Sequence, residues 1–309
     1  MSESKDKKSR APVKKQTQDS YDRRLNYLNN GEPIDNYAFL HDVNVVMEKI
    51  QKFKPGTQRN YMIAIVSALK NVPVMSSVLK TYTDLMDKFN SELKVNNTKS
   101  ETQKENWITQ GEVEQVYNKI LDDNIDHLCM KRKNITEPFW SSITDLIVLS
   151  LFILQAPRRI LDYRQMYITK GNPKELDATK NYYVVSTHTF IFNNYKTAGI
   201  YKTQTQMACP KLQNILDCYI KIHPIKLTAS NEIPMLCNFR GEPYTVSCDI
   251  TRILNRIFKR ECGKRVSINL LRNIYLTDKF GSKISELKDT ASLMGTSSNT
   301  IENTYVKVD

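Results

Sequence analysis

The chain has 309 residues, a mass of 35.8 kDa, a formal net charge of +12 and a pI near 9.3. This length exceeds what one compact core usually takes and favours two domains, while the basic excess favours a polyanionic partner, nucleic acid before an anionic membrane surface. The six cysteines and four histidines are dispersed without metal-ligand spacing, which argues against a metalloenzyme and a disulfide scaffold. We expect no metal and no cofactor.

The N-terminal segment is polar and rich in lysine, and it lacks the apolar stretch of a secretory signal. The most apolar run, residues 143–154, contains Asp145 and Ser150 and is too short to span a bilayer. We therefore expect an intracellular protein with no membrane partner. Nucleus, cytoplasm and a viral replication site stay open as compartments.

The N-terminal part of the chain predicts a tail and a helical domain. Residues 1–30 show no sustained apolar period, which predicts a disordered basic tail, either a solvated segment or an arm that follows phosphates. Residues 31–95 carry three helical stripes of apolar side chains, the second of them capped by Thr57, and form the first predicted domain. Residues 96–106 are polar and form the predicted linker.

The second predicted domain covers residues 107–309. Thr109 and Glu112 have capping-box spacing ahead of a helical stripe, and a buried helix is expected over 138–155. Residues 182–192 and 200–208 favour two strands of a hairpin. Further helices are expected over 211–222, 247–261, 267–280, 283–294 and 298–306, with Ser247, Ser267, Ser282 and Ser298 as N-caps. The predicted fold class is mainly α with a small antiparallel β-sheet.

Two basic groups are candidates for a site. Arg158 and Arg159 follow the buried helix directly, and a desolvated arginine needs an anion or a carboxylate, so one of them either pairs with Asp162 or another acid or helps to form an anion site. Lys196 lies in the hairpin turn 193–199, where it is either simply solvated or able to reach into a groove.

The C-terminal part of the chain adds two further candidates. Asn269 and Arg272 are three residues apart and share one helical face. Gly295 has the position of a helix C-cap, and Tyr305 follows ten residues later on a short final helix. Each signal is weak alone, but their order along the chain is informative.

Taken together, these motifs resemble the catalytic domain of the tyrosine recombinase (phage integrase) family. Residues 157–163, Pro-Arg-Arg-Ile-Leu-Asp-Tyr, are similar to the family box G-L-R-x-x-E-L, with Arg159 at the arginine and Asp162 at the acid. Asn-Leu-Leu-Arg at 269–272 resembles H-x-L-R, and Met-Gly-Thr-Ser at 294–297 resembles L-G-H-S. Asn269 and Thr296 therefore replace residues that are usually histidine.

The resemblance covers residues 105–309 and, more loosely, 36–95, where residues 57–61 resemble the start of a helical core-binding domain. It implies such a domain followed by a mixed α+β catalytic domain. It also implies a site-specific DNA recombinase or integrase of a mobile element or virus, acting on double-stranded DNA as a tetramer without metal or ATP.

The resemblance also assigns roles to individual residues. Tyr305 would be the nucleophile that forms a 3′-phosphotyrosine, and Arg159 and Arg272 would clamp the phosphate. Lys196 would be the general acid, with Lys202 as the fallback. Asn269 and Thr296 could donate hydrogen bonds but could not exchange a proton near pH 7 as histidine does.

Three alternatives stay open. The departures at Asn269 and Thr296 fit a catalytically degenerate relative that only binds DNA. A type IB topoisomerase would use the same chemistry as a monomer. In a basic structural protein, these arginines and Tyr305 would be ordinary core and surface residues.

Overall fold

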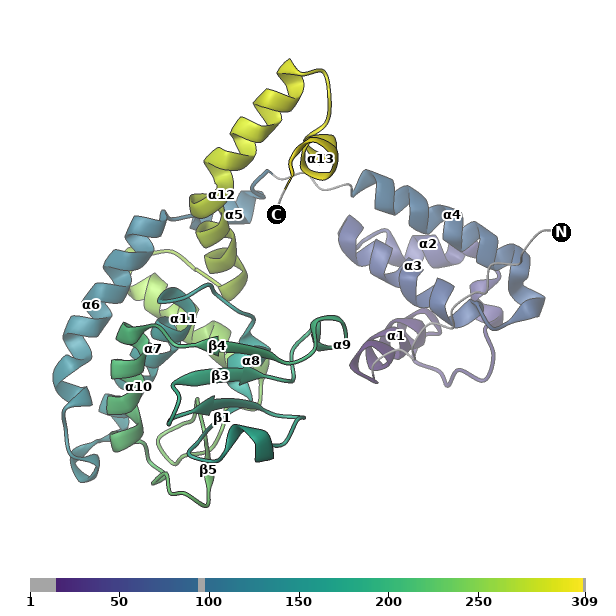
Figure 1. The fold of residues 1–309 in the computed structure, drawn as a ribbon. Coiled ribbons are helices and arrows are strands. Elements are labelled where there is room, and N and C mark those ends of the chain that lie inside the picture. The colour runs from purple at the N-terminus through teal and green to yellow at the C-terminus, as the bar shows by residue number, and fades with distance from the viewer. Residues whose placement is uncertain (1–14, 94–97, 308–309) are drawn as a thin grey trace. The chain divides into compact units, whose positions relative to one another are not determined.

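The computed structural model describes residues 15–93 and 98–307, and Figure 1 shows its fold. The described residues are mostly helical and include one five-stranded sheet, which confirms the prediction of a mainly α chain with a small sheet. The chain divides into two compact units, Met1–Thr98 and Lys99–Asp309. Buried apolar side chains form a separate cluster in each unit.

Every regular element among the described residues of the first unit is a helix. Its elements are α1 (Lys15–Leu28), η1 (Ala38–Leu40), α2 (Val43–Ile50), α3 (Pro55–Leu69), η2 (Pro73–Met75) and α4 (Ser76–Glu92). Helix α3 packs against α1 and α4, and the hydroxyl of buried Tyr82 on α4 donates a hydrogen bond to the carbonyl of Leu40 at 3.0 Å. These contacts give the first unit a core of its own.

Two predictions for this region are wrong. Residues 15–28 form a helix rather than a disordered tail, because Leu25 and Leu28 lie one turn apart and are buried in the core against α3; residues 1–14 lie outside the described part. Thr57 does not cap α3. The helix begins two residues earlier at Pro55, whose fixed φ and missing N–H suit a first helical position.

The second unit begins with helices where a linker was predicted. Its helices are α5 (Glu101–Asn106), α6 (Gln110–Leu128), η3 (Arg132–Asn134), α7 (Glu137–Ile153), α8 (Ile160–Arg164), η4 (Pro173–Glu175), α9 (Ala198–Tyr201), α10 (Pro210–Ile222), α11 (Ser247–Cys262), α12 (Ile268–Leu293), α13 (Ser298–Thr300) and the π-helix η5 (Ile301–Tyr305). Helix α5 occupies most of the predicted linker because Ser100 and Gln103 form a capping box.

The core of the second unit is built around α7, which packs against α6, α10 and α11. The predicted capping box of Thr109 and Glu112 opens α6, and the predicted buried helix is α7, whose Trp140 donates a hydrogen bond to the carbonyl of Cys237 at 3.1 Å. Asp145, which is buried on α7, is ion-paired with Arg256 and Arg260 of α11. This pairing fixes the two helices against each other.

The sheet consists of β1 (Met166–Thr169), β2 (Asn181–Val184), β3 (Thr189–Phe192), β4 (Gln204–Met207) and β5 (Glu232–Pro234), in the order β4-β3-β2-β1-β5. The prediction of an antiparallel sheet is wrong for one pair, because β1 and β2 run parallel. The predicted strand 182–192 is two strands joined by a turn at which His188 adopts a φ of 49°. The predicted hairpin is β3 and β4, which pair antiparallel.

The end of the chain differs most from the prediction. Helices 267–280 and 283–294 are one continuous helix, α12, which Ser267 caps as predicted by accepting a hydrogen bond from the N–H of Leu270. Ser282 lies inside α12 and is no cap. Gly281 does not break α12, because a glycine within a helix costs only about 1 kcal/mol relative to alanine.

Helix α12 ends where Gly295 predicts, with φ of 61° and hydrogen bonds from the N–H of Gly295 to Ser292 and from the N–H of Thr296 to Ala291. The chain then turns back, and α13 packs beside the outer half of α12 (Figure 1). Ser297, rather than the predicted Ser298, caps this last helix.

Candidate functional site

A pocket of about 280 Å³ lies in the second unit where the segment after α7 meets α8, the β3–β4 loop and α12. Arg159 and Arg272, the two residues to which the family resemblance assigned a phosphate clamp, both line it. The lining residues are Ala156, Pro157, Arg158, Arg159, Asp162, Tyr195, Thr197, Tyr201, Gln204, Gln206 and Arg272.

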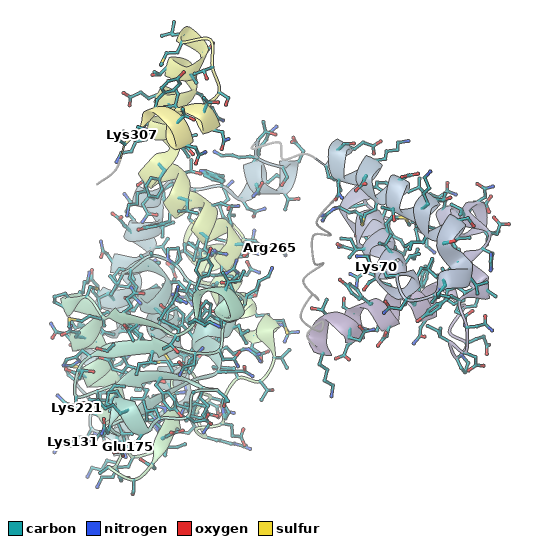
Figure 2. All side chains as sticks on the ribbon, turned by 45° about the vertical axis from the view of Figure 1, so that its right-hand side comes forward. Lys70, Lys131, Glu175, Lys221, Arg265 and Lys307 are labelled. Carbon is teal, nitrogen blue, oxygen red and sulfur yellow. The ribbon has the colours of Figure 1, made fainter. Side chains whose placement is uncertain are left out.

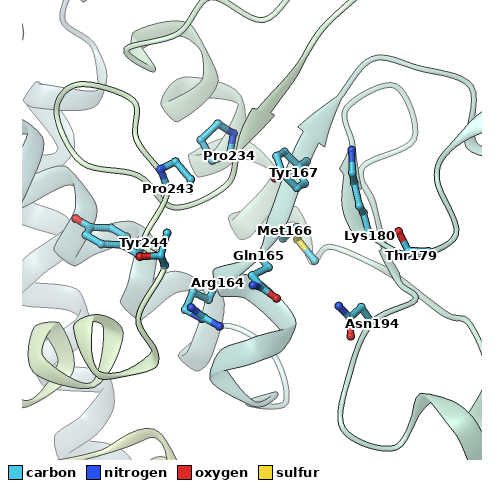
Figure 3. Close-up of a pocket in the computed structure, with 11 residues that line it drawn as sticks. Arg164, Gln165, Met166, Tyr167, Thr179, Lys180, Asn194, Pro234, Pro243 and Tyr244 are labelled. Atoms are coloured by element: carbon cyan, nitrogen blue, oxygen red, sulfur yellow. The ribbon is translucent and has the colours of Figure 1, made fainter. Parts of the chain in front are cut away.

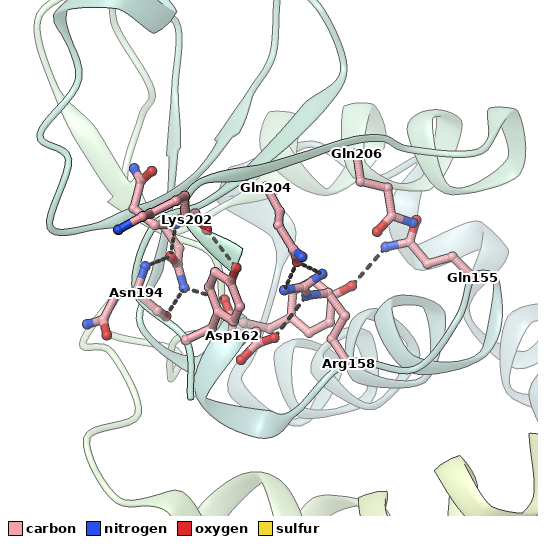
Figure 4. Close-up of polar contacts among 11 residues, drawn as sticks. Gln155, Arg158, Asp162, Asn194, Lys202, Gln204 and Gln206 are labelled. Carbon is pink, nitrogen blue, oxygen red and sulfur yellow. Dashed lines mark hydrogen bonds and ion pairs between the residues drawn. The ribbon is translucent and has the colours of Figure 1, made fainter. Parts of the chain in front are cut away.

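Of the two adjacent arginines, Arg158 is the one with a structural role. Its Nε donates to Asp162 Oδ2 at 2.9 Å, and its two terminal nitrogens donate to Gln204 Oε1 at 3.0 and 3.1 Å (Figure 4). Its guanidinium also stacks 3.7 Å from the ring centroid of Phe192. These contacts fix α8 to strands β3 and β4, and they engage each of the three guanidinium nitrogens of Arg158 with the protein itself.

Arg159 and Arg272 are free of such partners. Neither guanidinium has a hydrogen bond or an ion pair with any described residue of the chain. Burial and then the charge of Arg159 lower the pKa of Arg272, which places the two cations within electrostatic reach of each other. Two unpaired guanidiniums in one pocket are suited to hold an oxyanion with planar pairs of N–H donors.

Asp162 lies beneath these cations. It is 3% exposed, and burial raises the pKa of its carboxyl against the opposing effect of Arg158. Its Oδ2 pairs with Arg158, whereas its Oδ1 is buried without a hydrogen-bond partner. The acid therefore orients Arg158 through one oxygen, and its other oxygen stays buried.

The β3–β4 loop forms the rim of the pocket and carries Lys196. The side chain of Asn181 accepts hydrogen bonds from the N–H groups of Asn193 and Asn194 at 2.8 and 2.7 Å and donates to the carbonyl of Asn194. The hydroxyl of Tyr195 donates to the carbonyl of Lys202 at 2.6 Å across the loop. Lys196 is exposed between two lining residues, and its own side chain does not line the pocket.

Asn269, Thr296 and Tyr305 do not line this pocket. Asn269 is exposed one turn before Arg272, and Tyr305 is 60% exposed on η5. From Arg272 to the end of α12 at Leu293 the helix rises about 30 Å. Figure 2 agrees, since Lys307 lies beside the outer half of α12 whereas Arg265 precedes its start.

Several lining residues were not predicted from the sequence. Gln204 and Gln206 alternate on β4 with the more exposed Thr205 and Met207, and Gln206 donates to Gln155 Oε1 at 3.2 Å. This two-residue period is the signal that could have identified them. Tyr195 and Tyr201 gave no such signal, because their place at the rim depends on how the loop folds.

A second polar cluster in the same unit is structural. The imidazole of His223 accepts a hydrogen bond from the N–H of Ile225 and contacts the carbonyl of Pro234, both at 3.1 Å, and its Nε2 lies 3.2 Å from Cys237 Sγ. Burial lowers the pKa of His223 to about 4 and raises the pKa of Cys237 to about 12. Both groups are neutral at pH 7 and closed to solvent, so this pair is unsuited to nucleophilic chemistry.

No protein-family model matches the chain, and neither a curated protein nor a solved structure matches it significantly. Among the described residues, no helix is both long enough and apolar enough to cross a lipid bilayer. The function is therefore inferred from the geometry of the arginine pocket and from the motifs that contribute to it.

Proposed function

We propose that this protein is a tyrosine-type DNA strand transferase, a site-specific recombinase or integrase that cuts and rejoins DNA through a 3′-phosphotyrosine. The observation that carries the proposal is the pairing of Arg159 and Arg272, which come from distant parts of the sequence and line one pocket without a protein partner. The loop that bears Lys196 forms the rim of the same pocket. An arginine pair beside an exposed lysine suits a phosphodiester better than it suits a structural ion pair.

The proposed step uses side chains of this protein and water. The phenolic oxygen of Tyr305 gives its proton to a water molecule and forms a bond to the phosphorus, and the bond from phosphorus to the 5′-oxygen breaks. Lys196 gives its proton to that leaving oxygen, while Arg159 and Arg272 stabilise the charge that builds on the non-bridging oxygens. The phosphotyrosyl ester conserves the bond energy, so attack by a 5′-hydroxyl reverses the cut.

Asn269 and Thr296 are the weak positions of this scheme. Both can donate a hydrogen bond to a phosphate oxygen, but neither can exchange a proton near neutral pH. We expect slower cleavage than in an enzyme with imidazoles at these places.

We further propose that Tyr305 acts on the phosphate held by another copy of the chain. Tyr305 lies beyond the far end of α12, in the segment that turns back beside the outer half of this helix, and it is exposed and does not line the pocket of its own arginines. A nucleophile placed in this way would serve a neighbouring protomer, and the assembly on DNA would be a homo-oligomer, a tetramer when two sites pair.

A nicked suicide duplex, whose short cleaved product diffuses away, tests the chemistry because it traps the covalent protein–DNA adduct. The target sequence is first selected from random duplexes by binding. We expect the wild-type chain to form the adduct and Tyr305→Phe to form none. An adduct of equal yield from Tyr305→Phe would refute the assignment of the nucleophile.

Mixing two inactive variants tests whether Tyr305 acts in trans. Tyr305→Phe keeps the arginines, and Arg272→Ala keeps the tyrosine, so a mixture can rebuild a complete site only between two chains. We expect the mixture to restore the adduct, on the Arg272→Ala chain alone. If each variant is inactive and the mixture is too, while the wild type is active, Tyr305 acts within its own chain.

A DNA-binding protein without cleavage is the second candidate. It is favoured by the absence of Tyr305 from the arginine pocket and by the two missing imidazoles. It predicts salt-sensitive DNA binding with no adduct from the wild-type chain.

A further inference from the structure

A second cavity in the same unit, of about 270 Å³, opens at the other end of helix α8 (Figure 3). The Arg159 pocket borders the first residues of α8, whereas this cavity borders its last residue, Arg164. None of the residues to which the proposed strand-transfer step assigns a role lines it. The lining residues are Arg164, Gln165, Met166, Tyr167, Thr179, Lys180, Asn194, Pro234, Pro243, Tyr244 and Thr245.

Arg164 is the feature of this cavity that the fold leaves unexplained. Its Nε and Nη1 atoms are buried, and neither has a hydrogen-bond partner. No ion pair with any described residue compensates its charge, and a guanidinium does not lose its proton at physiological pH. Burying such donors unpaired is costly, and the remaining nitrogen, Nη2, is neither buried nor hydrogen-bonded to a described residue, so a ligand in the cavity can reach the guanidinium through it.

The rest of the lining fits an anion with an apolar part. No acidic side chain is among the lining residues, and Lys180 adds a second cation, which Glu232 contacts at 3.2 Å from outside the cavity. The amide side chains of Gln165 and Asn194 have no hydrogen bond among the described residues and can donate. Aromatic and aliphatic walls come from Met166, Tyr167, Pro234 and Tyr244.

We propose that this cavity is a phosphate-binding site in which Arg164 is the principal donor. The free Nη2 donors of a permanently charged guanidinium, with an ammonium and amides nearby, match the several acceptor oxygens of a phosphate group. The volume and the apolar walls fit a phosphate ester the size of a mononucleotide. The phosphate belongs either to such a free ester or to a nucleic-acid backbone.

Calorimetric titration of the full-length chain with inorganic phosphate and with deoxyadenosine monophosphate, in a phosphate-free buffer of low ionic strength, tests the site. We expect both probes to bind the wild-type chain, and Arg164→Met to lower their affinity at least about tenfold. Arg240→Met is the matched control, since Arg240 is exposed and lies outside the cavity, and it should bind as the wild type does.

Thermal unfolding supplies a second readout. Without phosphate, Arg164→Met should melt no lower than the wild type, because it removes an unpaired buried charge; with phosphate, only the wild type and Arg240→Met should gain stability. The proposal is overturned if Arg164→Met binds both probes as tightly as the wild type, or if the wild type binds neither up to about 10 mM. A clear fall in the melting temperature of Arg164→Met without phosphate would also overturn it, because the guanidinium would then have a partner within the fold.

Duplex DNA separates the two sources of phosphate. If Arg164→Met also weakens DNA binding, the site takes a backbone phosphate; if DNA binding is unchanged while nucleotide binding is lost, the site takes a free ester. The titrations do not depend on strand transfer, and Tyr305→Phe should leave them unchanged.

Discussion

Two neighbouring arginines have different physical roles. The guanidinium of Arg158 is held by Asp162, Gln204 and the ring of Phe192, whereas the guanidinium of Arg159 has no partner among the described residues. The sequence predicted that one of the two would need an anion or a carboxylate, and Asp162 is the carboxylate that Arg158 meets. It could not predict which arginine, because the choice depends on Gln204 and Phe192, strand residues whose position is set by the folded sheet.

Substituting the two arginines should therefore give opposite results. Arg158→Met leaves Asp162 buried without its cation and should lower the free energy of unfolding by about 3 kcal/mol in urea titrations. Arg159→Met should change it by no more than about 0.5 kcal/mol. In DNA-binding assays over a range of salt, Arg159→Met should lower affinity and reduce the salt dependence by about one counterion. Equal destabilisation by both changes would contradict this division of roles.

The buried histidine should make stability depend on pH. The pKa of His223 is about 4 in the folded protein and 6.5 as its ordinary value, so the unfolded chain binds a proton that the folded chain refuses. The neutral His223 therefore adds about 3 kcal/mol to the free energy of unfolding above pH 6.5. This stabilisation is lost as the pH falls to 4. His223→Gln should remove it from the pH profile of urea unfolding, whereas His41→Gln, at an exposed position, should not. A wild-type slope in His223→Gln would refute the assignment.

At the scale of elements, the sequence was most informative for long elements with local signals. The α6 capping box, the buried α7 and the Gly295 helix end follow from residues that are close in the chain. Strands β1 and β5 were missed because they have only four and three residues and pair with distant segments. The turn between β2 and β3 was missed because residues 185–188 include no glycine, proline or asparagine.

Helix α12 shows why the predicted break did not occur. Gly281 and Ser282 weaken a helix, but hydrogen bonding on both sides continues through them and there is no proline to interrupt it. The stripe of Leu276, Phe280 and Ile284 nevertheless stays partly exposed, so the outer half has little packing to support it. Its stability therefore depends mainly on the intrinsic helix propensity of its residues.

Ser282→Ala tests the continuity of α12 through the sign of its effect. Within a continuous helix, alanine should stabilise residues 276–290 by about 0.5 kcal/mol and slow the exchange of their amide hydrogens. If Ser282 were an N-cap, the same change would destabilise the segment by about 1 kcal/mol. Gly281→Ala tests the same point. It should raise the free energy of opening that protects these amide hydrogens by about 1 kcal/mol, more than Ser282→Ala does.

At the scale of the whole molecule, two separate cores follow from the division of the chain at Thr98. The composition predicted more than one core, since 309 residues exceed what a single core usually needs. Both tryptophans, Trp107 and Trp140, belong to the second unit. Tryptophan fluorescence therefore reports the unfolding of that unit alone, whereas circular dichroism reports both.

A substitution that makes a cavity in the first unit should therefore leave the unfolding transition seen by tryptophan fluorescence unchanged. Tyr82→Ala removes a buried ring and its hydrogen bond to Leu40, and should destabilise the first unit by about 3 kcal/mol. We expect circular dichroism to show an earlier first transition and fluorescence to show none. Phe258→Ala, in the core of the second unit, is the control and should shift the fluorescence transition. A shift of fluorescence by Tyr82→Ala would mean that the two units unfold together.

The anchoring of the β3–β4 loop by Asn181 has an entropic consequence. Ordering a flexible loop when a ligand arrives costs roughly 1 kcal/mol or more for each residue that is fixed. Here one buried amide holds Asn193 and Asn194, and Tyr195 closes the loop onto Lys202, so most of that cost has been met during folding. The backbone that carries Lys196 is thus already ordered. Binding a phosphate at this residue would need to order little more than the lysine side chain itself.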